Sequence, residues 1–315
     1  MGVGVSVVVA VDGGGSKTDV IVADAASGTV LSRGRGPGCS HHAIGIDAAV
    51  AVIDAAVRAA LAEAGAEPDA VAHAGCYLTA IDLDEEQRAM TVALRALPWA
   101  ARALAVENDV FALLRAGTDA PDAAVVVCGT GINGAAITAD GRTARILALG
   151  VVSGDWGGAS GLADEVLWHA ARAEDGRGEP TMLRDAVASW TGRPDVHTVA
   201  VDIHTGALSR SALWPRIPDL MTIARAGDAV ARSLVERQGR EIAVLASSLL
   251  GRVGLLDRTV PVVLGGGIGS SGDPLMMAAL DAELAVRAPA AQTCIATRPP
   301  VDGALDLVLQ AARAG

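Results

Sequence analysis

The sequence of 315 residues has only four cysteines, and they are widely scattered: Cys39, Cys76, Cys128 and Cys294. It contains no Cys-x-x-Cys pair and no cysteine–histidine cluster, so neither a zinc site nor an iron–sulfur cluster is indicated. Isolated cysteines of this kind are typical of reduced thiols in the cytosol.

Long hydrophobic runs are also missing. The longest apolar run near the start, Val5 to Val11, is far too short to span a bilayer. It also lacks the basic segment and the small-residue cleavage site of a secretory signal. We therefore expect a cytoplasmic protein without a membrane partner.

Positive charge is scarce. Lysine and arginine together number 25 against 36 aspartates and glutamates, which gives a net charge of −11 and a pI of about 4.9. A nucleic-acid partner would need a basic face, so this class of function is excluded. The single lysine, Lys17, lies in the most glycine-rich early loop.

Hydrophobic residues make up 51% of the chain, and its length suits two domains of ordinary size. Residues 7–24 are predicted to form a strand, a glycine loop and a second strand. A third strand is predicted at 29–33. Residues 124–140 repeat this order, with a third strand predicted at 142–149. The repeat predicts two similar α/β domains with mixed sheets, each presenting its glycine loop to a common interdomain cleft.

Helices and further strands are predicted between the repeats. Asp47 is expected to cap a helix that ends at Gly65. The other expected helices are 85–97, 109–116, 162–173, 182–190, 219–250 and 303–314, and the other strands are 71–77, 102–106 and 260–264. Glycine, threonine, proline and aspartate cluster at 118–122, which predicts a first domain of residues 1–118, completed by 301–315, and a second domain of 119–300.

The first glycine loop is a candidate phosphate site. Glycines let backbone N–H groups approach a phosphate closely, and the residues that follow add donors and charge. The candidate residues are Gly13, Gly14, Gly15, Ser16, Lys17 and Thr18. Asp12 is placed to hold Mg²⁺ through water. The loop is not a Walker A motif, because no helix follows it directly, and an ordinary glycine-rich turn is the alternative.

The second loop, 129–134, formally matches the dinucleotide pattern G-x-G-x-x-G, but a strand rather than a helix is expected to follow it. As the counterpart of the first loop, it is expected to bind the other phosphates of the same nucleotide through Gly129, Thr130 and Gly131. The third loop follows the strand 260–264, and its Gly265, Gly266 and Gly267 would allow close approach to an adenine and its ribose.

Five segments in order resemble the motifs of the sugar kinase/actin/heat-shock chaperone superfamily. They are residues 12–18, 107–109, 128–131, 264–267 and 301–304, which correspond to phosphate 1, connect 1, phosphate 2, adenosine and connect 2. The residues in these segments are similar to those of the N-acetylglucosamine kinase group of the BadF/BadG/BcrA/BcrD ATPase family. The resemblance implies a two-domain actin-like ATPase (ribonuclease H-like) fold, with ATP and Mg²⁺ as cofactors and a homodimer as the assembly that relatives suggest.

The resemblance also implies roles for residues in the sugar site. Asp109 matches the general base that acts on the sugar 6-hydroxyl, although its position also suits an ordinary helix cap. The residues implied to contact the sugar are Ser40, His41, Asn108, Asp109, Gly129, Asp155 and Trp156. Ser40 stands where relatives carry an asparagine, and His41 or His42 is a candidate for the missing hydrogen bond. Core packing is the alternative for Trp156.

We therefore predict an ATP-dependent sugar kinase that phosphorylates the 6-hydroxyl of N-acetylglucosamine or a related amino sugar. Glucosamine or another hexose is the alternative substrate. A second alternative, an ATPase that activates a partner enzyme, would require paired cysteines for a cluster. A sugar-responsive repressor would require a helix-turn-helix ahead of the first strand, where we expect only a few residues.

Overall fold

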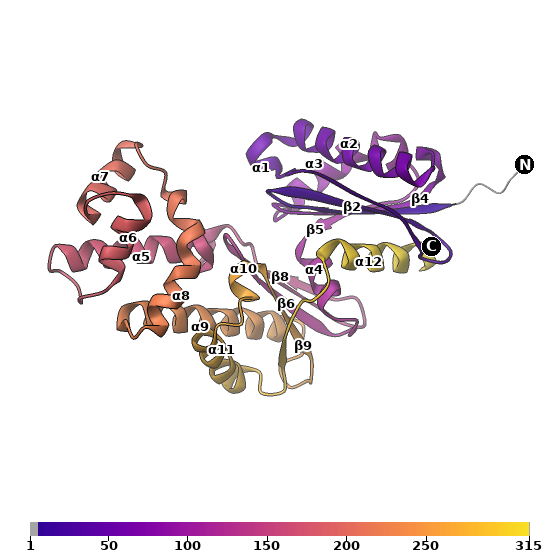
Figure 1. Ribbon diagram of the computed structural model, residues 1–315. Helices are drawn as coiled ribbons and strands as arrows, with labels where there is room; N and C mark the ends of the chain where they lie inside the picture. The colour runs from indigo at the N-terminus through magenta and orange to yellow at the C-terminus, as the bar shows by residue number, and fades with distance from the viewer. Residues whose placement is uncertain (1–5, 315) are drawn as a thin grey trace, which may run out of the picture. The chain divides into compact units, whose positions relative to one another are not determined.

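The computed structural model describes residues 6–314 and divides the chain into two compact units (Figure 1). One unit runs to Ala120 and resumes at Ile295, and the other is Pro121–Cys294. Each unit is built on a five-stranded sheet. The sequence had placed the divisions at 118/119 and 300/301, close to these positions.

The sheet of the first unit has the order β3-β2-β1-β4-β5. Its strands are β1 (Val7–Gly13), β2 (Lys17–Asp24), β3 (Val30–Pro37), β4 (Val71–Leu78) and β5 (Leu104–Asn108). The first three form antiparallel pairs, whereas β4 is parallel to both β1 and β5. Alternate residues of β1 are buried in two different cores, one on each face of the sheet. This explains why β1 is apolar from Val7 to Val11.

Helices cover both faces of this sheet (Figure 1). One face carries α2 (Ile46–Ala64) and α3 (Asp84–Arg95), and the other carries α4 (Val110–Gly117) and α12 (Pro300–Ala314). A short helix, α1 (His41–Ile44), and two 3₁₀ turns, η1 (Pro68–Ala70) and η2 (Pro98–Ala100), complete the unit.

The limits of α2 test two predictions about its ends. Gly65 adopts a left-handed conformation (φ 64°) and ends the helix as expected, because glycine carries no Cβ penalty there. The start was predicted wrongly: Gly45 occupies the cap position and Asp47 lies in the first turn. A carboxylate in the first turn still favours the helix through its dipole.

The sheet of the second unit has the order β10-β9-β6-β7-β8. Its strands are β6 (Ala123–Cys128), β7 (Ile132–Ile137), β8 (Thr143–Arg145), β9 (Pro261–Gly265) and β10 (Gln292–Ile295). The antiparallel β6-β7-β8 and the parallel partner β9 repeat the pattern of β1-β2-β3 with β4. The strand predicted at 142–149 is shorter because Ala148 has a positive φ of 55° and a 3₁₀ turn, η3 (Gly150–Ser153), follows.

The remaining helices belong to the second unit. They are α5 (Gly158–Glu174), α6 (Leu183–Thr191), α7 (Val196–Thr205), η4 (Arg210–Arg216), α8 (Ile217–Arg225), α9 (Ala229–Arg252), α10 (Gly266–Gly269) and α11 (Pro274–Arg287). The helix predicted at 219–250 is interrupted, because Gly227 has a φ of 103° and the Asp228 carboxylate then caps α9 by accepting the Ala231 N–H at 2.8 Å. Within the described residues, every helix is too short or too polar to cross a bilayer.

Candidate active site

The first glycine loop is the turn between β1 and β2. The Gly14 N–H donates to the Lys17 carbonyl at 2.8 Å, and Gly15 and Ser16 are exposed at the tip. Thr18, predicted to add a donor, is fully buried, and its hydroxyl donates to the Pro37 carbonyl at 2.7 Å. The tip of the turn is therefore open to a ligand, whereas Thr18 holds β2 against β3.

Lys17 lies in a small charge cluster at the start of β2. It forms an ion pair with Asp19, which also accepts a hydrogen bond from the Arg35 Nε at 2.6 Å. Burial by itself raises the pKa of Asp19, but the hydrogen bonds from Arg35 and Lys17 outweigh it and lower the pKa overall. Asp19 therefore remains ionised and holds the lysine beside the turn.

The segment 38–45, called the sugar loop here because it contains the predicted sugar ligands Ser40 and His41, packs directly on this turn. The Cys39 N–H donates to the Gly14 carbonyl at 3.0 Å. Gly38 leaves no room for a side chain, since a Cβ there would clash with the Gly15 carbonyl oxygen. Ser40 follows at the cap position of α1, with no capping hydrogen bond from its hydroxyl. The structure thus brings together two loops that the sequence analysis had singled out separately.

Asp12 and Asp109 lie at the same edge of the sheet. The parallel strands place Gly13 opposite Leu78, and Leu78 opposite Asn108. The pKa of the Cys39 thiol is raised, first by burial and then by the negative charges of Asp12 and Asp109. Asp12 immediately precedes Gly13, and the Asp109 N–H donates to the Leu78 carbonyl at 3.2 Å, so both residues lie at the edge of the sheet where the glycine turn begins.

Asp12 occupies an unfavourable environment for a charge. Burial is the main cause that raises its pKa to about 6, and the neighbouring Asp19 adds to the rise. Lys17 opposes both effects through its positive charge. A carboxylate with this pKa is ionised at neutral pH but is poorly solvated, which favours a nearby cation.

Asn108 is fully buried and ties the start of α4 to the loop between β4 and α3. Its Nδ2 donates to the Ile81 carbonyl at 3.1 Å and to Asp82 Oδ1 at 2.9 Å, while its Oδ1 accepts the Val110 N–H at 3.1 Å. Asp109 occupies the cap position, but its carboxylate makes no capping hydrogen bond. The cap interaction seen at the start of α4 comes from Asn108.

In the second unit, the second and third glycine loops meet at one pocket. The turn 129–131 joins β6 to β7, and its Gly129 carbonyl accepts the Ala159 N–H of α5 at 2.8 Å. Gly266 has a φ of 77°, and a Cβ there would clash with the Cys128 carbonyl oxygen. These close approaches require glycine. The prediction that a strand and not a helix follows Gly134 is confirmed by the antiparallel pairing of β7 with β6.

The pocket between these loops has a volume of about 720 Å³. It is lined by the two glycine loops on one side and by a largely apolar segment on the other: Gly129, Thr130, Ala159, Ser211, Trp214, Pro215, Ile217, Pro218, Gly267 and Ile268. The apolar segment, 211–218, was not singled out from the sequence. Its Trp-Pro and Ile-Pro pairs are a visible signal, but no pattern in the sequence says which loop they face.

Asp155 and Trp156 line a different pocket of about 440 Å³ in the same unit. Asp155 Oδ2 accepts the Gly150 N–H at 2.9 Å and the Ser153 hydroxyl at 2.6 Å. Trp156 packs against the core of the unit, its Nε1 donates to Glu165 at 2.9 Å, and Arg237 covers one ring face at 4.0 Å. The pocket of Gly129 and Thr130 does not include these two residues.

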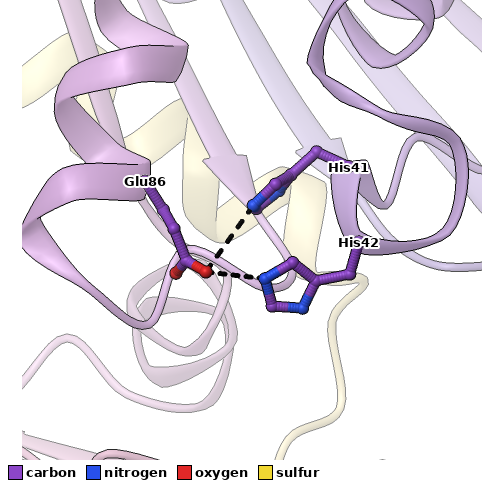
Figure 2. Close-up of side chains that lie close together, drawn as sticks. All are labelled: His41, His42 and Glu86. Atoms are coloured by element: carbon purple, nitrogen blue, oxygen red, sulfur yellow. Dashed lines mark hydrogen bonds and ion pairs between the residues drawn. The ribbon is translucent and has the colours of Figure 1, made fainter.

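The two histidines of the sugar loop face α3 (Figure 2). His41 and His42 point toward Glu86, whose Oε1 lies 2.6 Å from the His42 Nε2. Burial lowers the pKa of His41, and the neighbouring His42 adds to the effect. The sequence analysis did not single out Glu86; its position three residues after Leu83 marks a helix start but does not reveal its partners.

Comparison with known proteins identifies the family of this chain. The pattern of the BadF/BadG/BcrA/BcrD ATPase family matches residues 9–305. An N-acetyl-D-glucosamine kinase of Dictyostelium discoideum is 23% identical over 275 residues, which cover 82% of this chain and 84% of that protein.

Solved structures share the fold. A putative N-acetylglucosamine kinase from Chromobacterium violaceum superposes with a TM-score of 0.71 at 23% identity, covering 97% of this chain and 99% of the other. A glucokinase of the ROK family from Streptomyces griseus, solved with glucose and AMPPNP, superposes with a TM-score of 0.55 at 20% identity. The match covers 96% of this chain and 99% of the other. The predicted actin-like ATPase fold is thereby confirmed. Since the family pattern spans nearly the whole chain, this protein belongs to the BadF/BadG/BcrA/BcrD ATPase family.

Proposed function

We propose that this chain is an ATP-dependent sugar kinase that transfers the γ-phosphoryl group to the 6-hydroxyl of N-acetylglucosamine or a closely related amino sugar. Family membership supports ATP as the phosphoryl donor. The observation that carries the proposal is the edge of the first sheet, where the strand register places Asp12 and Asp109 beside the glycine turn.

The nucleotide is proposed to bind at the glycine loops. The pocket of about 720 Å³ offers flat apolar walls, including Trp214, to an adenine. In the second unit, turn 129–131 would approach the phosphates through backbone N–H groups, and in the first unit the exposed tip of the first loop is proposed as a phosphate site of the same kind. Asp12 fits a hydrated Mg²⁺, because its poorly solvated carboxylate would be stabilised by a cation. Bound Mg²⁺ supplies charge screening for the phosphates.

Asp109 is proposed as the general base. Phosphoryl transfer passes through a loose transition state, so the protein chiefly positions the hydroxyl and accepts its proton late. The hydrogen bonds of Asn108 fix the backbone on both sides of Asp109. We propose that Asn108 positions Asp109, and that Ser40, at the start of α1, contributes a polar contact to the sugar.

The alternative of an ATPase activator has less support. Such a protein needs cysteines that can hold a cluster between subunits. All four cysteines lie in the described part of the chain, where Cys39, Cys76 and Cys128 are buried and Cys294 is half-buried. They do not form an accessible pair of thiols.

The decisive experiment measures ADP release with Mg-ATP in a coupled assay. N-acetylglucosamine, glucosamine, N-acetylmannosamine, N-acetylmuramic acid and glucose are compared, with a sugar-free reaction as the baseline. Sugar-dependent release, with the phosphate found on O6 of the product by NMR, supports the proposal. Release that is equally fast without any sugar favours the ATPase alternative, and preference for glucose over every amino sugar removes the assigned substrate class.

A further inference from the structure

Two adjacent histidines and a glutamate from a distant helix form a compact cluster in the first unit. His41 and His42 begin α1, and Glu86 lies in the first turn of α3 (Figure 2). One ligand atom from each side chain lies within 4.8 Å of the others. We propose that His41, His42 and Glu86 bind a divalent transition-metal ion of the zinc class. This inference does not depend on the proposed kinase activity.

The distances suit an ion of this size. The Glu86 Oε1 is 2.6 Å from the His42 Nε2 and 3.8 Å from the His41 Nε2. Ligand atoms about 2.0–2.2 Å from a tetrahedral zinc ion lie about 3.3 Å apart, so the two separations bracket the required value. His42 is 51% exposed, so its ring has room for the small movement that would admit an ion.

His41 provides an independent indication of a ligand. Its side chain is only 8% exposed, and neither ring nitrogen has a hydrogen-bond partner among residues 6–314. A buried polar group without a partner is destabilising, and native proteins seldom leave one unsatisfied. The His42–Glu86 hydrogen bond alone would account for two members of the cluster and leave His41 unexplained. A metal ion would bind one nitrogen of His41 together with His42 and Glu86, and so give all three side chains a common partner.

The Glu86 carboxylate is held in a suitable orientation by its own helix. Its Oε2 accepts the backbone N–H groups of Asp82 at 2.9 Å and Leu83 at 2.8 Å. These bonds leave Oε1 directed at the imidazoles. Hydrogen bonds of this kind to the outer oxygen of a ligating carboxylate orient it toward the metal.

The donor set indicates the class of ion. Two imidazole nitrogens and one carboxylate oxygen suit zinc, cobalt or nickel, whereas magnesium and calcium prefer oxygen ligands alone. Three protein ligands with an exposed histidine among them leave a fourth position for water. The sequence analysis found no zinc site because it looked for cysteine–histidine spacing, and the third ligand here lies more than forty residues along the chain.

The test is a zinc titration of protein that carries no polyhistidine tag and has been stripped with a chelator. A chromophoric chelator competes for the ion, and cobalt substitution reports the coordination by its visible spectrum. We expect one equivalent per chain, with affinity lowered at least about tenfold in H42A and in E86Q. Glu86→Gln retains an oxygen that can accept the N–H groups of the helix start, so the fold should persist, which circular dichroism checks.

The matched control is H204A, because His204 is exposed on α7 of the other unit. Zinc binding that survives in H204A and is lost in H41A, H42A and E86Q supports the site. Absence of stoichiometric binding to the wild-type protein overturns it, as does equal affinity in the wild type and all three cluster variants. Either of these results would reduce the cluster to a His42–Glu86 hydrogen bond.

Discussion

Replacing Asp12, at the end of β1, with asparagine is expected to increase the stability of the protein and to decrease its activity. Burial, opposed in part by Lys17, raises the pKa of Asp12 from 3.8 to about 6. The difference between these values corresponds to about 3 kcal/mol of free energy, since one pKa unit is worth about 1.4 kcal/mol. We expect D12N to raise the free energy of unfolding at pH 7 by up to about 3 kcal/mol and, if Asp12 holds Mg²⁺, to lose phosphoryl transfer.

The effect should depend on pH with a definite sign. Between the unfolded pKa of 3.8 and the folded pKa of about 6, native Asp12 binds more protons than the unfolded chain does. The contribution of this group to wild-type stability therefore falls as pH rises through that window and is constant above it. The variant lacks this titration, so its advantage should be small near pH 4 and complete at pH 7.

Urea denaturation of both proteins at about pH 4.5, 5.5 and 7 measures the difference. The control is Asp257→Asn, because Asp257 is exposed in a turn of the other unit, where a substitution should change stability by less than about 0.5 kcal/mol at every pH. A D12N protein no more stable than the wild type at pH 7, or a gain that is the same at all three values, would refute burial as the cause.

Three further variants test other parts of the proposed site. D109N should lower kcat by at least about a hundredfold while nucleotide affinity, measured by calorimetry, stays the same; normal turnover would remove Asp109 from the base role. Lys17→Ala should move the acid limb of the kcat/KM profile to higher pH, because Lys17 lowers the pKa of Asp12; an unchanged profile would contradict that coupling. Gly266→Ala should cost at least about 3 kcal/mol in thermal or urea unfolding, since positive φ and a clash with Cys128 combine. Gly272→Ala, which has a φ of 64° and open space, isolates the φ effect and should cost about 1 kcal/mol.

The sheets and the glycine turns could be predicted because their causes are local. A strand segment buried on both faces must be apolar, as Val7 to Val11 of β1 is, and a tight turn between two such strands needs glycine. The repeat of this pattern about a hundred residues later then indicates a second sheet. The last helix also followed from its own apolar periodicity.

The meeting of distant segments could not be predicted. The facing of Glu86 toward His41 and His42 depends on how α3 packs against the sheet, and no spacing in the sequence encodes it. The apolar wall around Trp214 joins the glycine loops only in three dimensions. Likewise, Thr18 is buried, unlike Ser16 at the tip of the turn, because it lies in β2 between Gly13 of β1 and Gly36 of β3.

The return of α12 to the first sheet has a consequence for synthesis of the chain. Its Val301, Ala304 and Val308 complete the core that also contains Val8 and Ala10 of β1, and Gly303 lets α12 approach α4 closely. While the ribosome is still making the second unit, this face of the first sheet therefore has α4 but lacks α12. The second unit, which is continuous in sequence, can fold before the first is finished. Chaperones would meet the uncovered β1 face in nascent chains and in any product truncated before residue 300.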